Sequence, residues 1–231
     1  MSPSAQTRSR GWFVTLLAGL ALATALATGL FDTGHPAAAD AGHRHAHATV
    51  TKGRAAAFQD DMRKLWEDHV TWTRLAIVTF ADGSAGFDAT ADRLLKNQED
   101  IGAAIDPFYG KAAGDRLTAL LKDHIGVAVE LLQAAKGGDD AAFADAHTRW
   151  YANSDDIADF LAEADPRSWP QATMRAAMRT HLDQTLAEAS HELTGQYAAS
   201  VADYDEIHQH ILMMADVLSS GIVKAFPSRF R

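Results

Sequence analysis

Apolar residues recur every three or four positions along most of the chain beyond residue 54, which predicts amphipathic helices. The clearest stretch runs from Leu117 to Leu161. An apolar stripe interrupted by His124 fills its first half, and one interrupted by Asn153 fills its second half. The turn sequence Gly-Gly-Asp-Asp at 137–140 separates the two halves. The pattern therefore predicts two antiparallel helices, each with one polar residue on the face that would be buried.

Turn and helix-breaking residues divide the rest of the chain in a similar way. Gly83 follows the first predicted helix and Pro107 follows the second. Pro166 and Pro170 follow the fourth helix, and Pro227 follows the sixth. We expect helices over about 55–80, 89–105, 171–194 and 199–225, and one on each side of the 137–140 turn. No proline falls inside these helices. Only the turn at 194–195 depends on a single glycine, so the last two helices could instead form one bent helix.

The polar interruptions recur with a period near 56 residues. They are His69, His124 and His181 on the first helix of each pair, and Asn97, Asn153 and His208 on the second. Such a period, with one pair of helices in each unit, is typical of a repeated supersecondary unit. The predicted fold is therefore all-α: a six-helix antiparallel bundle made of three αα-hairpin repeats.

The turns of the hairpins lie midway between these polar residues. Gly83 is midway between His69 and Asn97, and Gly138 lies near the midpoint of His124 and Asn153. In an antiparallel bundle, residues equidistant from a turn lie at the same height. All six polar residues are therefore predicted to point inward in one layer.

A buried layer of imidazole and amide groups has two interpretations. The side chains could form hydrogen-bonded pairs that only set the register of the helices. Alternatively, the histidines could bind Zn(II), Cu(II) or a small ligand while the asparagines orient the imidazole rings. The candidate ligands are His69, His124, His181 and His208, and the orienting residues are Asn97 and Asn153.

Two weaker metal patterns accompany this layer. Glu188 and His191 have the Glu-x-x-His spacing of carboxylate-bridged di-metal bundles, with Asp205 as a further candidate ligand. The alternating histidines of the segment 40–54 could chelate a metal weakly, although this segment could equally be a solvated linker. These histidines are His43, His45 and His47.

Residues 1–39 have the pattern of an export signal. Arg8 and Arg10 precede the uncharged apolar run 11–31, and three alanines at 37–39 form a cleavage site before Asp40. The apolar run is also long enough to remain as a membrane anchor. We therefore expect export to the periplasm, the cell envelope or the medium, with membrane contact only through this segment. The expected domains are a signal at 1–39, a histidine-rich tail at 40–54 and a helical domain at 55–231.

Composition narrows the classes of function. The net charge of −9, without a basic stripe, argues against nucleic acid as a partner. The absence of cysteine excludes disulfides and thiolate chemistry. No glycine-rich phosphate loop or Gly-x-Ser-x-Gly motif indicates an enzyme. The sequence favours a protein that binds a metal or small ligand, and the alternative is a structural or interaction protein of the cell envelope.

Several stretches resemble a bacterial family of uncharacterised helical proteins whose members are often labelled acetylglutamate kinase. They are 65–74 (LWEDHVTWTR), 94–102 (LLKNQEDIG), 107–110 (PFYG), 149–153 (RWYAN), 214–217 (MADV) and 221–224 (GIVK). The resemblance covers about residues 60–228 and implies a helical fold. It implies no kinase activity, because a kinase of that kind needs an α/β fold with glycine-rich phosphate loops.

Overall fold

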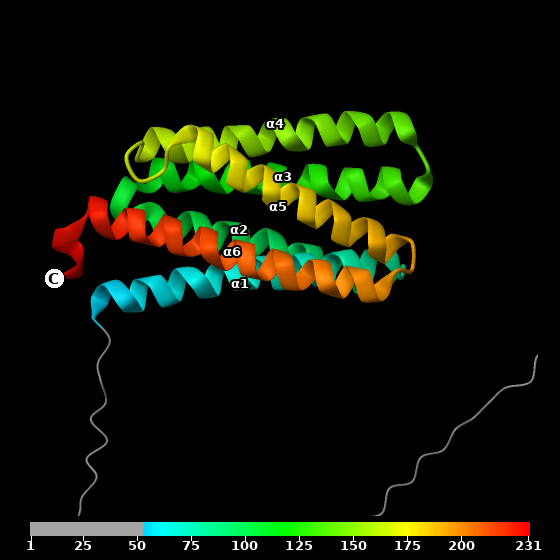
Figure 1. The fold of residues 1–231 in the computed structure, drawn as a ribbon, viewed down its shortest axis with the longest axis horizontal. Coiled ribbons are helices and arrows are strands. Elements are labelled where there is room, and N and C mark those ends of the chain that lie inside the picture. Colours follow the sequence, from blue (N-terminus) through cyan, green and yellow to red (C-terminus); the bar gives the residue numbers. More distant parts are fainter. Residues whose placement is uncertain (1–52) are drawn as a thin grey trace, which may run out of the picture. The chain divides into compact units, whose positions relative to one another are not determined.

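A computed structural model describes residues 53–231, which form helices joined by short turns (Figure 1). The elements are α1 (Arg54–Ala81), α2 (Phe87–Tyr109), α3 (Lys111–Gly137), α4 (Asp140–Ala164), α5 (Gln171–Leu193), α6 (Tyr197–Ala225) and the short 3-10 helix η1 (Pro227–Phe230). The described part of the chain contains no strand, so the prediction of an all-α bundle is confirmed. The predicted signal and most of the predicted tail lie outside the described residues.

Glycines in the left-handed region separate several of these helices. Gly138 has φ +68° and follows α3, and Asp139 then caps α4 by accepting a hydrogen bond from the Ala142 N–H at 3.0 Å. Gly195, at φ +73°, makes the turn between α5 and α6. The last two helices are therefore separate, as the turn at 194–195 predicted.

The sequence offers two breaks at the end of the second helix, Asp106-Pro107 and Tyr109-Gly110. The first was wrong, because α2 continues to Tyr109 with Pro107 in its last turn. A proline lacks the N–H that would bond one turn back, and near a helix end this removes only one bond. Gly110 ends the helix instead, with φ +85° and its N–H 2.9 Å from the Asp106 carbonyl.

Successive helices run in opposite directions, and α6 returns to pack against α1 (Figure 1). Each helix contacts its neighbours along the chain, so the six form a closed ring. The α1–α2, α3–α4 and α5–α6 turns lie together at one end, on the right of the view (Figure 1). The first helices of the three pairs, α1, α3 and α5, are therefore parallel to one another.

Large side chains fill the space inside the ring. Trp66, Trp150 and Trp169 belong to one continuous apolar core, to which all six helices contribute. At the end opposite the three turns, Phe58 of α1 packs on Phe230 of η1, with ring centroids 5.3 Å apart. Within residues 53–231, no helix combines the length and the hydropathy needed to cross a membrane.

Candidate binding site at the buried histidines

Three histidines from the three parallel helices meet in the core. His69 of α1, His124 of α3 and His181 of α5 are each at most 5% exposed. The ring centroids of His69 and His181 are 5.8 Å apart. These three sequence-predicted candidates therefore lie inward, as the layer pattern predicted.

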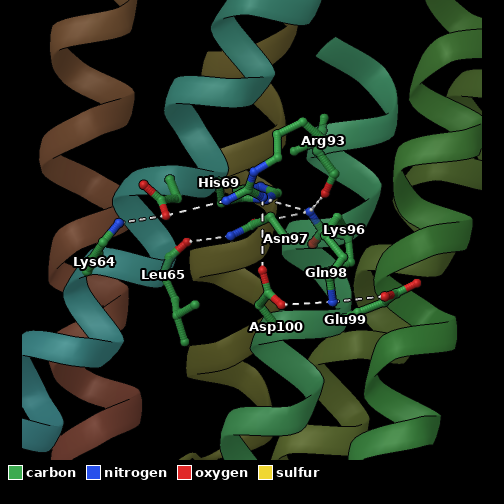
Figure 2. A network of polar contacts seen from close by, with 11 residues as sticks. Lys64, Leu65, His69, Arg93, Lys96, Asn97, Gln98, Glu99 and Asp100 are labelled. Atoms are coloured by element: carbon green, nitrogen blue, oxygen red, sulfur yellow. Dashed lines mark hydrogen bonds and ion pairs between the residues drawn. The ribbon is translucent and has the colours of Figure 1, made fainter. Parts of the chain in front are cut away.

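Asparagines from the neighbouring helices hold two of the pairs together. Asn97 of α2 donates to the Leu65 carbonyl of α1 at 3.0 Å, as Figure 2 shows. Asn153 of α4 donates to the Leu120 carbonyl of α3 at 3.1 Å. Each carbonyl lies four residues before the histidine of its own hairpin. Asn153 also places its Oδ1 2.8 Å from Nδ1 of His124, so it orients that ring as expected.

Gln98, which no sequence pattern singled out, holds the ring of His69. The Gln98 amide Nε2 lies 3.2 Å from Nδ1 of His69 and 2.9 Å from the Leu94 carbonyl (Figure 2). Because an amide nitrogen only donates, Nδ1 of His69 accepts and the ring proton is on Nε2. The spacing could have revealed this contact, since Gln98 follows His69 by 29 residues, as Asn153 follows His124.

The inward orientation predicted for His208 was wrong. Its side chain is 32% exposed and its Nε2 lies 3.3 Å from a Glu67 carboxylate oxygen. His210 takes the inner position: its Nε2 is 2.9 Å from the Ala177 carbonyl, and its ring stacks on His181 at 6.5 Å. Two positions along a helix rotate a side chain by about 200°. The spacing of 29 residues, applied to His181, selects His210.

Burial keeps the three inner imidazoles neutral. It lowers the pKa of His69 to about 3, and the neighbouring His124 lowers this pKa further. Burial likewise lowers the pKa of His124 to about 4 while its bond to Asn153 raises it. Burial and the neighbouring histidines hold the pKa of His181 well below its usual value. At neutral pH the cluster therefore carries no charge.

Two small cavities flank the histidines, and His69, His124 and His181 line both of them. One, of about 30 Å³, also borders Trp66 and Trp169. The other, which we call the inner cavity, has about 50 Å³ and also borders Trp150 and Thr185. Each has room for a few water-sized groups.

The inner cavity adjoins a larger pocket near the end of the bundle that carries the hairpin turns. This outer pocket has about 360 Å³ and lies between the ends of α3 and α5 and the start of α4. Four side chains line both spaces: Leu131, Leu132, Leu186 and Ala189. Exposed residues, Ala135 and Ser190, also line the outer pocket. The outer pocket therefore opens at the surface and reaches side chains that also line the inner cavity.

Several buried polar atoms around these spaces lack a hydrogen-bonding partner among the described residues. They include Nδ1 of His181 and the indole Nε1 atoms of Trp66 and Trp150. An unsatisfied buried polar group costs about 1–3 kcal/mol, and native proteins contain few of them. Trp150 and His181 both line the inner cavity, so two of these atoms belong to residues that border the same space.

A separate polar cluster joins α1, α5 and α6. Arg74 lies 2.9 Å from a Glu188 carboxylate oxygen and 3.2 Å from one of Glu192, and Ser200 donates to Glu192 at 2.6 Å. Both glutamates are buried. Burial raises the pKa of Glu188 to about 7, although Arg74 opposes this. Arg74 is therefore a shared counter-charge for two buried acids on α5, and its single positive charge balances one of them.

The residues of the predicted di-metal site have different surroundings. Glu188 is bound to Arg74, His191 has its Nδ1 2.6 Å from an Asp203 oxygen, and Asp205 is exposed. Among residues 53–231, no three histidine, cysteine or acidic side chains are grouped so that they could hold a metal ion. The tail histidines His43, His45 and His47 lie outside the described residues.

No protein-family model matches this chain, and neither a curated protein nor a solved structure is significantly similar to it. The functional argument therefore depends on the geometry of the histidine cluster and the spaces beside it.

Proposed function

We propose that this chain is an exported binding protein whose helical domain holds a small organic ligand beside the buried histidines. One observation carries the proposal. Nδ1 of His181 is buried without a partner among residues 53–231, and this residue lines an inner cavity that shares four side chains with the outer pocket. The signal-like pattern of residues 1–39 supports the proposed export.

The dimensions and chemistry of these spaces support a ligand site. The outer pocket, at about 360 Å³, lies within the size range of small-molecule sites, which are mostly apolar with a few placed polar groups. Two residues that line the inner cavity, Trp150 and His181, each carry a buried nitrogen without a partner among residues 53–231, and the proposed ligand would pair with them. A ligand seated in both spaces would satisfy polar atoms that the protein leaves unpaired.

A transition-metal ion is the second candidate. The ring separation of 5.8 Å between His69 and His181 suits two imidazoles on one ion, because Zn–N bonds are about 2 Å long. A stable site needs at least one more protein ligand, and the described residues offer no group of three. The organic ligand is therefore the better supported of the two.

We also infer that the three hairpins are copies of one unit of about 56 residues. The support is a hydrogen bond from the second helix of each pair to the carbonyl four residues before the histidine of the first helix. The donors are Asn97, Asn153 and His210, and the acceptors are Leu65, Leu120 and Ala177. The alternative is a structural role, in which the buried polar residues only fix the register of the helices through these three hydrogen bonds.

Titration of the full chain with N-phenyl-1-naphthylamine, an uncharged apolar fluorophore, tests the proposal. We expect fluorescence enhancement that saturates, and a loss of binding when Ala135→Trp or Ser190→Trp fills the outer pocket. Ala144→Trp is the control, because Ala144 is an exposed residue of α4 that does not line the pocket. No saturable binding, or equal binding by all three variants, overturns the proposal.

Parallel titrations with Zn(II) and Cu(II) test the second candidate. In one outcome, metal binding persists after His43, His45 and His47 are replaced by alanine but disappears in His69→Leu. The core histidines would then form a metal site, and the metal would replace the organic ligand as the proposed partner. Metal binding that disappears with the three tail substitutions would assign it to residues 40–54.

A further inference from the structure

We infer that the ligand is an uncharged amphiphile, with a hydroxyl group in the inner cavity and a short apolar chain in the outer pocket. This inference depends on the function proposed above and specifies the chemistry of the ligand at the same site.

The outer pocket determines the apolar part. Its walls are the leucines shared with the inner cavity, together with Phe143 and Leu193. Its polar lining side chains, Ser190 and Thr194, come from the end of α5 and the turn after it. A chain of methylene groups placed here would be removed from water, which favours binding in proportion to the apolar area buried.

The inner cavity determines the polar part. The Trp150 indole N–H can only donate, so its partner must accept a hydrogen bond. Nδ1 of His181 accepts in one neutral tautomer and donates in the other. A hydroxyl group has one donor hydrogen and two acceptor lone pairs, so it can serve the indole and either tautomer of the imidazole.

The surroundings of the two spaces disfavour a ligand with a charged head group, such as a carboxylate or an ammonium group. Among residues 53–231, no lysine, arginine, aspartate or glutamate lines the inner cavity or the outer pocket. Burial keeps the pKa of His124 at about 4, so this neighbouring ring supplies no positive charge at neutral pH. A carboxylate or ammonium head would be buried without a counter-charge, which is costly.

Competition against N-phenyl-1-naphthylamine on the full chain at pH 7.5 tests this chemistry with four probes of equal chain length. We expect 1-hexanol to displace the fluorophore at a concentration about tenfold lower than 1-fluorohexane, although fluorohexane is the more hydrophobic. Hexanoate and hexylammonium should compete still more weakly. In His181→Leu the preference for hexanol over fluorohexane should disappear. It should remain in His208→Leu, because His208 lies on α6, which lines neither space, and is 32% exposed.

The possible failures are separable. If the fluorophore binds but fluorohexane or hexanoate competes as well as hexanol, the inference about ligand chemistry is wrong and the proposed function stands. A hexanol preference that survives His181→Leu also overturns the inference. If His181→Leu does not fold, Trp150→Phe provides the same comparison, because it removes the indole N–H and keeps an aromatic ring. If the fluorophore does not bind to the unaltered chain, both proposals fail.

Discussion

Nδ1 of His124 lies 2.8 Å from Oδ1 of Asn153, and the amide nitrogen of the same asparagine donates to the Leu120 carbonyl one turn before His124. Asn153 thus accepts from the ring and donates to the backbone of a single neighbouring helix. Because Nδ1–H of His124 donates, its Nε2 is an acceptor. His69 has the opposite arrangement, since its Nδ1 accepts from Gln98 and its proton lies on Nε2. The two neutral rings therefore have opposite hydrogen-bonding roles at Nε2.

Asn153→Ala should destabilise the protein by about 1–3 kcal/mol, because it leaves Nδ1 of a buried histidine without a partner. Urea unfolding of the full chain at pH 7.5 measures the change. Gln133→Ala is the matched control, since it removes an exposed amide from α3 and should change the stability by less than about 0.5 kcal/mol. Equal effects of the two substitutions would mean that the bond to His124 contributes nothing.

Acidification should weaken the fold through the buried histidines. The pKa of His124 falls from 6.5 to about 4 on folding, so below pH 6.5 the unfolded chain binds protons that the folded one does not. Stability should therefore fall as the pH drops from 6.5 to about 4. This residue alone accounts for about 3 kcal/mol, at about 1.4 kcal/mol per pH unit. His69 acts in the same direction down to about pH 3, its pKa in the folded state.

Glu188 acts in the opposite direction over much of this range. Its pKa rises from 4.5 to about 7 on folding, so its contribution is present below pH 4.5 and is lost as the pH rises to about 7. Acidification weakens the fold through three buried histidines and strengthens it through one carboxyl group. The urea midpoint of unfolding should therefore still be lower at pH 5 than at pH 7.5. His124→Leu should reduce this pH dependence and Glu188→Gln should increase it. A midpoint that does not change with pH in the unaltered protein would contradict the neutral histidine cluster.

Arg74→Met should destabilise the protein by about 3–5 kcal/mol at pH 8, since it leaves two buried glutamates without a counter-charge. The cost should be smaller at pH 5, where Glu188 is protonated in the folded state. Arg116→Met provides the comparison: its ion pair with Glu163 is largely exposed, and its loss should cost at most about 1 kcal/mol. Chemical denaturation at the two pH values separates these outcomes.

Two glycines allow α2 and α3 to approach closely. A Cβ at Gly102 would lie 1.9 Å from Oγ1 of Thr118 and 2.7 Å from the Gly114 carbonyl oxygen. Gly102→Ala should therefore cost about 1–3 kcal/mol through overpacking. Gly126→Ala should instead stabilise α3 by about 0.5–1 kcal/mol, because that helical position is open and alanine favours helix. Thermal melts of the two variants should shift in opposite directions.

Helices and turns were predictable because the chain encodes them locally. Apolar periodicity and the turn residues at 137–140 define α3 and α4 closely, and a single glycine at 195 was enough to separate α5 from α6. The end of α2 was not predictable in the same way. Pro107 can lie in the last turn because Gly110 ends the helix three residues later.

The inner faces were only partly predictable. Symmetry about a turn identified His69, Asn97, His124 and His181 as buried, but it assigned His208 to a position that His210 occupies. Distance from a turn determines the height of a residue along the bundle, but it does not determine which way the side chain points. An error of two residues therefore selects a side chain on the opposite face of the helix. The buried ion cluster of Arg74 depends on contacts between α1, α5 and α6, which no local pattern records.

The contact between Phe58 and Phe230 brings the first and last turns of the described bundle together. Since α6 packs on α1 as a neighbour in the ring, the starting point of the chain is arbitrary with respect to the packing. A circular permutant that joins residue 231 to residue 53 through a short glycine linker and opens at Gly138 would preserve every contact between adjacent helices. The order in which the six helices are synthesised is therefore separable from the structure that they form.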